Sequence, residues 1–149
     1  MHLIFKRLGA EDIEQLGAVA DDIFDHPIDV RFARDFLADP RNILIVALAD
    51  DRVIAQLVAI VHRHLDAPPD LFVENLGVAA SWRRRGVARR LIAMAFEEGA
   101  KQGARTAWVA TEEDNDAANA LYAATGAAAG RFVMFSYQSL SGIAEKDAP

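Results

Sequence analysis

Hydrophobic and polar positions recur along this chain with two periods, which predict its helices and strands. Apolar residues return with helical spacing in four segments, and they alternate or run continuously between turn residues in six others. The expected helices cover residues 11–24, 30–37, 86–102 and 116–125. The expected strands cover residues 3–8, 43–49, 53–61, 71–78, 106–110 and 132–138. This order predicts an α/β (α+β) fold, with a mixed sheet and helices on both faces.

Turn residues divide these segments. Asp50-Asp51-Arg52 indicates a hairpin, and Pro68-Pro69 indicates a loop before the strand at residues 71–78. Gly103 and Gly126 stand where helices end with a left-handed residue. No repeat or linker interrupts the chain, so we expect one domain over residues 1–138 and a frayed tail over 139–149.

Composition narrows the possible functions. A net charge of −6 argues against general nucleic-acid binding and suits a small cationic partner. The absence of cysteine excludes a thiolate metal site and an acyl-cysteine intermediate. No apolar run reaches membrane-spanning length, and residues 1–7 are too short for a signal sequence. We therefore expect a cytoplasmic protein that does not bind membranes or metal. His62 and His64 share a strand face but have no third ligand at suitable spacing.

Three arginines precede the helix that begins near Gly86. Helix N-termini present unpaired N–H groups and the positive end of the dipole, which bind phosphate. Gly86 allows an anion to approach the backbone, and Ala88 keeps the next turn small. The loop lacks the Lys of a Walker A motif and two of the glycines of a dinucleotide fingerprint. It predicts a pyrophosphate site, with a solvated basic helix cap as the alternative.

Two motifs together resemble the Gcn5-related N-acetyltransferase (GNAT) family. Arg83-Arg84-Arg85-Gly86-Val87-Ala88 is similar to its acyl-CoA pyrophosphate motif, and Asn75-Leu-Gly-Val to its fourth strand. Asn115, Ala118, Leu121-Tyr122 and Gly126 are similar to its later N-x-x-A-x-x-L-Y-x-x-x-G element. The resemblance implies a sheet splayed between strands 4 and 5, and binding of acetyl-CoA. Cofactor binding is expected at Leu76, Gly77, Val78, Arg83, Arg84, Arg85, Gly86, Val87, Ala88, Arg89, Asn115, Ala118 and Tyr122.

Direct acetyl transfer to an amine needs a neutral amine, a donor to the carbonyl oxygen, and a proton for the thiolate. The resemblance implies that Tyr122 protonates the thiolate and that the Val78 N–H is the oxyanion donor. Tyr122 could otherwise be a core aromatic, and Asn115 could cap its helix as well as bind pantetheine. Glu74 and Asn75 are adjacent in a strand, so we expect them to face opposite sides. The general base is expected to be Glu74, and the alternatives are water or one of Asp70, Glu112, Glu113, Asp114 and His26.

The acceptor is expected to be an aminoglycoside. The chain further resembles the type I aminoglycoside 3-N-acetyltransferases, whose activity confers antibiotic resistance, but Asn75 replaces their Asp. Acceptor contacts are expected from Glu74, Asn75, Glu112, Glu113, Asp114 and His26. The rival hypotheses are acetylation of another small amine or a protein amine, and a catalytically inactive acyl-CoA sensor. Family members often dimerise, which leaves a homodimer open.

Overall fold

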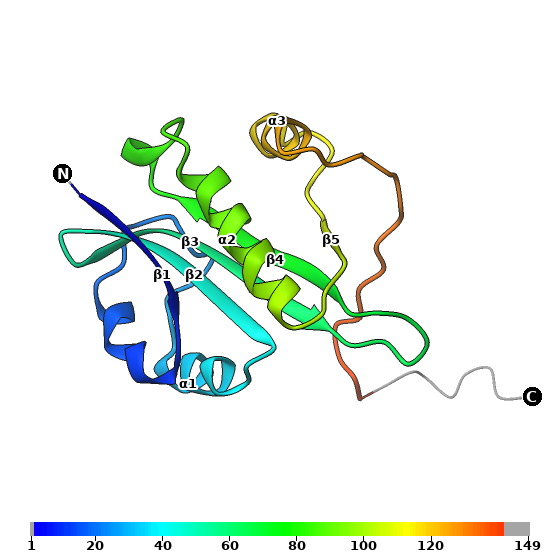
Figure 1. Cartoon of the computed structure of the whole chain (residues 1–149), viewed down its shortest axis with the longest axis horizontal. Coiled ribbons are helices and arrows are strands. Elements are labelled where there is room, and N and C mark those ends of the chain that lie inside the picture. The colour runs from blue at the N-terminus through cyan, green and yellow to red at the C-terminus, as the bar shows by residue number, and fades with distance from the viewer. Residues whose placement is uncertain (1, 142–149) are drawn as a thin grey trace, which may run out of the picture.

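A computed structural model of the chain describes residues 2–141. Its sheet contains five strands in the order of the sequence (Figure 1). These are β1 (Leu3–Leu8), β2 (Asn42–Ala49), β3 (Arg52–His62), β4 (Asp70–Val78) and β5 (Thr106–Val109). The helices are η1 (Ala10–Gly17), α1 (Val30–Ala38), η2 (Ala80–Trp82), α2 (Val87–Lys101) and α3 (Asp116–Ala124). This is the GNAT fold that the resemblance implies.

The sheet is mixed, and its one parallel pair determines where a ligand can enter. β1 to β4 form antiparallel pairs, whereas β4 and β5 run parallel. The β4–β5 ladder begins at Asp70 and Thr106 and ends at Val73 and Val109. β4 then continues to Val78 with no β5 partner, so the two strands separate halfway along β4.

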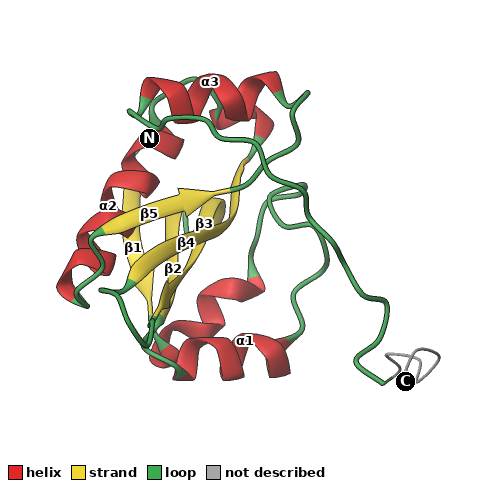
Figure 2. Cartoon of the chain, turned by 90° about the vertical axis from the view of Figure 1, so that its right-hand side faces the viewer, coloured by secondary structure: helices red, strands yellow, loops and turns green. Residues whose placement is uncertain are grey.

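Helices cover both faces of the sheet (Figure 2). α2 packs on one face, where Leu91 and Ala95 join the buried cluster formed by Leu57, Ala59 and Val73. The opposite face of β2 and β3 is covered by η1 and α1, against Leu44, Val46 and Leu48. β2 and β3 therefore bury side chains on both faces, which explains why β2 is a nearly continuous apolar run. No helix within residues 2–141 is both long enough and apolar enough to span a bilayer.

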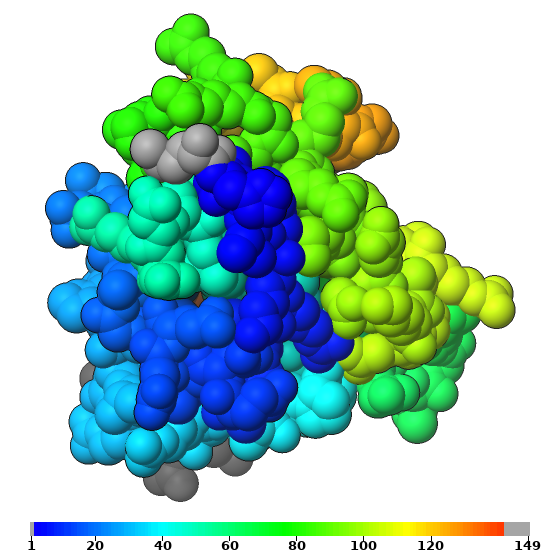
Figure 3. Space-filling view, turned by 60° about the vertical axis from the view of Figure 1, so that its left-hand side comes forward, coloured from blue at the N-terminus to red at the C-terminus, as the bar shows by residue number. Residues whose placement is uncertain are grey.

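An ion pair attaches the edge strand β1 to α2. The Arg7 Nη1 atom lies 2.6 Å from Glu98 Oε2, and Lys101 Nζ lies 2.5 Å from Glu98 Oε1. Both interactions lower the pKa of Glu98, with the Lys101 hydrogen bond the larger cause. β1, dark blue in Figure 3, borders α2 along this side of the molecule.

The helix predicted at residues 11–24 is shorter than expected and is a 3-10 helix. Its second half instead forms an extended bridge between Val19 and Val53. The Ala20 N–H donates to the Val53 carbonyl at 2.8 Å, and the Val53 N–H donates to Ala18 at 2.9 Å. Asp22 has a φ of 59°, which helices do not allow. Pairing with the sheet therefore overrides the local helical periodicity, while Ile23 remains buried.

The strand predicted at residues 132–138 is absent from the sheet. These residues have no regular secondary structure and pair with no strand, and their side chains are exposed. Strand formation needs a partner edge, which the local pattern cannot supply. Of the predicted tail, Ser139, Leu140 and Ser141 are exposed, and residues 142–149 lie outside the described range. The predicted helix ends at Gly103 and Gly126 are confirmed, because their φ angles are 90° and 96°.

Candidate functional site

The separation of β4 from β5 leaves backbone groups of β4 open. In an antiparallel pair, residues alternate between pointing their N–H toward the partner and away from it. The Ala79 N–H donates to the Ile54 carbonyl at 2.9 Å, which makes Ala55 and Val78 a non-hydrogen-bonded pair. The Val78 N–H therefore points away from β3, into the space that β5 has left. By the same alternation, the Leu76 N–H points to this open side and the Gly77 N–H points to β3.

The missing side chain of Gly77 has a role in packing. A Cβ atom at this position would lie 2.1 Å from the Ile23 carbonyl oxygen. The glycine therefore allows the segment before α1 to pack directly on β4.

The N-terminus of α2 has the properties of an anion site. Gly86 is the N-cap residue, with a φ of 79°, and no side chain caps the helix. A Cβ atom built on Gly86 meets no atom within 4 Å, so the space above it is open. The first hydrogen bond into this helix joins Arg90 to Gly86, and within residues 2–141 the N–H groups of Val87, Ala88 and Arg89 have no partner. No acidic residue lies in the first turn.

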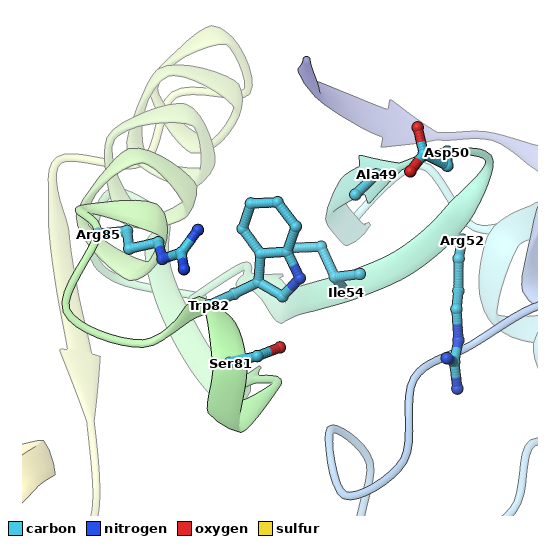
Figure 4. A pocket seen from close by; sticks show the side chains of 7 residues that line it. All are labelled: Ala49, Asp50, Arg52, Ile54, Ser81, Trp82 and Arg85. Carbon is cyan, nitrogen blue, oxygen red and sulfur yellow. The ribbon is translucent and has the colours of Figure 1, made fainter. Parts of the chain in front are cut away.

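The three arginines differ in their surroundings. Arg83 donates from Nε to the Val78 carbonyl at 3.0 Å, which connects the loop to the open part of β4. Arg84 has a φ of 57° and is exposed. The Arg85 guanidinium lies 5.0 Å from the centre of the Trp82 ring. Figure 4 shows the Trp82 ring between Arg85 and Ile54, in a hollow that the β2–β3 hairpin also lines. Trp82 therefore anchors the loop against the sheet.

α3 brings Tyr122 to the core on the side of the sheet that α2 covers. Tyr122 is half-buried and packs with Leu121 against the α2 cluster. Burial raises the pKa of its phenol above the ordinary value of 10.0. Its hydroxyl makes no hydrogen bond within residues 2–141. Asn115 caps α3 by accepting from the Ala118 N–H at 3.1 Å, and its amide nitrogen remains available. The capping role predicted for Asn115 is therefore confirmed.

A β-bulge changes the predicted geometry around Glu74. Val58 pairs with Asn75 and Ala59 with Val73, so Glu74 is an extra residue without a partner on β3. The prediction that Glu74 and Asn75 face opposite sides assumed regular alternation, which the bulge breaks. Asn75 lies on the face opposite α2. Glu74 is exposed, at the first position beyond the β4–β5 ladder.

Asn75 is part of a hydrogen-bond chain that ends in a carboxylate. The buried Gln56 amide donates to the Ile23 carbonyl at 2.7 Å and to Asn75 Oδ1 at 2.5 Å. Asn75 then donates from Nδ2 to Asp25 Oδ2 at 3.0 Å. The resemblance implies an Asp at position 75, where this chain has Asn. Asp25 places a carboxylate beside that position. Asp25 and Asn75 are 50 residues apart, so no local motif could indicate this pair.

Asp25 lies in a hollow on the side of the sheet opposite α2. Asp21, Asp22, Phe24 and His26 line the same hollow. The structure therefore brings His26, a predicted acceptor residue, together with Asp25. The acidic loop 112–114 lies apart from this hollow, after β5, and all three residues are exposed. Glu113 forms an ion pair with Arg131 at 2.9 Å.

The two histidines at the far end of β3 have a local partner. His64 Nε2 lies 2.9 Å from Asp70 Oδ2, and His62 Nδ1 lies 3.6 Å from Asp70 Oδ1. In the described part of the chain, no group of three or more His, Cys, Asp or Glu residues is arranged to hold a metal ion.

Comparison with known proteins decides the family. Residues 11–127 match the model of the acetyltransferase (GNAT) family. The chain belongs to this family. The match includes β4, the arginine loop, α2 and α3, which are the elements that build the candidate site. This GNAT chain is therefore an acetyltransferase of the fold predicted from its motifs. No curated protein sequence is significantly similar to it.

Solved structures with the same fold include aminoglycoside-modifying GNAT enzymes. AAC(6′)-Iy, in complex with the bisubstrate analogue CoA-S-monomethyl-acetylneamine, is 25% identical in sequence to this chain. The alignment covers 93% of this chain and 99% of that chain, with a TM-score of 0.78. An aminoglycoside acetyltransferase from an uncultured soil metagenomic sample, in complex with sisomicin, is 21% identical. The alignment covers 93% and 96% of the two chains, with a TM-score of 0.76.

A third structure shows that this fold is not restricted to one activity. A protein described as a transcriptional regulator from Bacillus halodurans C-125 is 20% identical over 91% of this chain and 99% of its own, with a TM-score of 0.74. Such a likeness establishes the fold alone. The acceptor of this GNAT enzyme must therefore be argued from its own residues.

Proposed function

We propose that this GNAT enzyme transfers the acetyl group of acetyl-CoA directly to a primary amine of an aminoglycoside. The observation that carries this proposal is the position of the open Val78 N–H on β4. On one side of it lies the anion-binding start of α2, and on the other lies the Asn75–Asp25 pair.

The chain's own residues fit CoA. The unpartnered N–H groups of Val87, Ala88 and Arg89, with open space above Gly86, suit a pyrophosphate. Arg84, exposed beside them, supplies charge and donors. The backbone of Leu76 and Val78 and the free amide of Asn115 would bind the pantetheine arm. When bound, acetyl-CoA supplies a thioester whose carbonyl carbon the amine attacks as the C–S bond breaks.

Three residues of the chain have chemical roles in this proposal. The Val78 N–H donates to the carbonyl oxygen as negative charge develops there. Tyr122 donates its phenolic proton to the departing thiolate, and its raised pKa keeps that proton in place at neutral pH. Glu74 is exposed at the mouth of the opening between β4 and β5. It accepts, through a bridging water molecule, the proton that the amine loses.

The Asp25 carboxylate would hold an ammonium group of the acceptor rather than the reacting amine. Asn75 precedes Val78 by three residues, which is about 10 Å along a strand. A carboxylate at that distance favours an acceptor with several amines, of which one is held and another reacts. The neighbouring Asp21, Asp22 and His26 suit further polar contacts in the same hollow. An exposed acidic loop at residues 112–114 adds attraction for a polycation.

The position of acetylation on the aminoglycoside is a separate part of the proposal. The sequence resemblance indicates the 3-N position, for which the comparisons give no support. The name AAC(6′)-Iy refers to the 6′ position, and we take the 6′ amine as the preferred site because that relative aligns over nearly its whole length.

The test is release of free CoA thiol with a panel of aminoglycosides, polyamines and short peptides. Saturable turnover with aminoglycosides, and a singly acetylated product whose position is assigned by NMR, is the expected result. Turnover confined to polyamines or peptides would reject the aminoglycoside and keep the acetyltransferase. CoA binding without turnover on any amine would support the inactive sensor, for which the Asn at position 75 is the one favourable observation.

A further inference from the structure

A buried glutamine on β3 is polar where its neighbours in the core are apolar. Gln56 has no exposed surface, and within residues 2–141 it is the only polar or charged residue that is buried. Its Nε2 atom donates to the Ile23 carbonyl and to Asn75 Oδ1, whereas its own Oε1 atom is buried with no hydrogen-bond partner in the described chain. An unpaired buried oxygen costs free energy. Packing alone therefore does not explain an amide at this position.

The hydrogen-bond chain from Gln56 to Asp25 can run in one direction only. A side-chain amide donates at one end and accepts at the other, and its partners decide which way it points. The Ile23 carbonyl only accepts, so Gln56 must turn its Nε2 atom toward it. The same nitrogen donates to Asn75 Oδ1, which leaves Asn75 Nδ2 to donate to the Asp25 carboxylate. A backbone carbonyl thus sets the orientation of the Asn75 amide.

The Asp25 carboxylate depends on this orientation. Asp25 is exposed, in a segment without helix or strand between η1 and α1. Its Oδ2 atom accepts from Asn75 at 3.0 Å, and within residues 2–141 its Oδ1 atom has no hydrogen-bond partner. One oxygen is therefore held at β4, and the other is free to bind a ligand in the hollow that Asp25 lines. An amide suits position 75, because a second carboxylate there would repel Asp25.

We propose that Gln56 is a positioning residue for acceptor binding. Gln56 orients the Asn75 amide, and Asn75 in turn holds the Asp25 carboxylate toward an ammonium group of the acceptor. Because Gln56 is fully buried, it acts only through these two residues. This inference rests on the aminoglycoside acceptor proposed above. It also gives a physical reason for Asn at position 75, which must donate to the carboxylate that Asp25 supplies.

Acceptor kinetics of Gln56→Glu test this role. The substitution nearly keeps the size of the side chain but replaces its NH₂ group by an oxygen. Asn75 is then expected to turn Nδ2 toward position 56 and Oδ1 toward Asp25, which releases the carboxylate. KM for an aminoglycoside should rise about 10-fold or more, as for the loss of a hydrogen bond to a charged group. KM for acetyl-CoA and kcat with a simple monoamine should stay unchanged.

Gln15→Glu is the matched control for this substitution. Gln15 Oε1 is also buried without a partner in the described chain, but the residue lies on η1 and takes no part in the hydrogen-bond chain. Gln15→Glu should leave all three kinetic constants unchanged. If Gln56→Glu raises KM for the aminoglycoside no more than Gln15→Glu does, or raises KM for acetyl-CoA equally, the positioning role is wrong.

A double-mutant comparison separates positioning from a general structural effect. Asp25→Asn leaves no carboxylate to hold, so adding Gln56→Glu to it should change KM for the aminoglycoside by less than about twofold. An equal rise in both backgrounds would overturn the proposal. If Gln56→Glu does not fold, Gln56→Met removes the donor without adding a charge. The same comparison then applies, with Gln15→Met as its control.

A measurement without acceptor distinguishes this inference from the proposed function. In ¹⁵N-labelled protein, the side-chain amide signal of Asn75 is assigned by its absence from Asn75→Ser. Asp25→Asn should shift this signal in the natural protein, because Asn75 Nδ2 donates to Asp25. It should not shift the signal in Gln56→Glu, where the amide points the other way; an equal shift in both would overturn the proposal. The expected shifts without aminoglycoside turnover would reject the acceptor and still support the orienting role of Gln56.

Discussion

Replacing Gly77 by alanine should destabilise the fold at the junction of β4 and the segment before α1. The added Cβ atom would lie 2.1 Å from the Ile23 carbonyl oxygen and 2.9 Å from its carbonyl carbon. Cβ atoms essentially never approach other atoms within 3.0 Å, so the Ile23 backbone must move. Both atoms belong to the backbone, and no side-chain rotation can relieve the contact.

Two costs determine the size of this effect. Ile23 is only 2% exposed, and forcing additional volume into a packed core costs about 1–3 kcal/mol. The moving carbonyl also accepts the 2.7 Å hydrogen bond from the buried Gln56, whose loss costs about 1–3 kcal/mol. Together they lower the free energy of unfolding by about 2–6 kcal/mol, and the melting temperature by at least about 5 °C.

Thermal and urea unfolding followed by circular dichroism measure this cost. Gly17→Ala is the matched control, because a Cβ atom at Gly17 meets nothing within 4 Å. It should change the free energy of unfolding by no more than about 0.5 kcal/mol. If Gly77→Ala unfolds at the same temperature as Gly17→Ala, then the close packing of Ile23 on β4 is wrong.

Three further changes test the cofactor site, the acid and the attachment of β1. Gly86→Val places a branched residue at a φ of 79° and should weaken CoA binding at least about tenfold by calorimetry; Gly130→Val, in open space, should not. Tyr122→Phe should lower kcat by about 100-fold in initial-rate assays, with KM for acetyl-CoA unchanged. In the natural enzyme, deprotonation of the Tyr122 phenol should reduce kcat only above pH 10.0, because burial raises its pKa. Glu98→Gln should reduce stability by about 1–2 kcal/mol at pH 7. The pKa of Glu98 is lowered from 4.5, so its stabilisation is complete above pH 4.5 and is lost as the pH falls through the folded value; urea midpoints of the two proteins should therefore converge in acid.

The sequence was sufficient where local chemistry determines structure. The strands of the antiparallel sheet, the helix that begins after Gly86 and the left-handed residues Gly103 and Gly126 follow from apolar patterns and turn residues within each segment. The GNAT family could be inferred because the arginine loop and the Tyr122 motif each lie on one continuous stretch.

The errors arose where distant segments decide the geometry. Residues 18–24 have helical periodicity, but hydrogen bonds with Val53 hold part of them extended. Residues 132–138 have a strand pattern but pair with no strand of the described chain. Glu74 is displaced by a bulge that depends on pairing with β3, which no periodicity reveals.

The proposed acceptor role of Asp25 could not be predicted from the sequence for the same reason. The Asn at position 75 by itself indicates a lost carboxylate, whereas the structure places the Asp25 carboxylate beside it. Only the packing of Ile23 on Gly77, and the buried Gln56 beside it, brings Asp25 to β4.

Acceptor kinetics of Asp25→Asn test most directly whether a multiply charged amine is held at the Asn75–Asp25 pair during acetyl transfer. Asp66→Asn, in the exposed loop before β4, is the matched control. Removing one ammonium–carboxylate interaction should raise KM for an aminoglycoside by about 10–100-fold, at about 1.5–3 kcal/mol. KM for acetyl-CoA and for a simple monoamine should stay unchanged. If KM for the aminoglycoside in Asp25→Asn equals that in Asp66→Asn, the acceptor does not bind at this pair and the account of the site is contradicted.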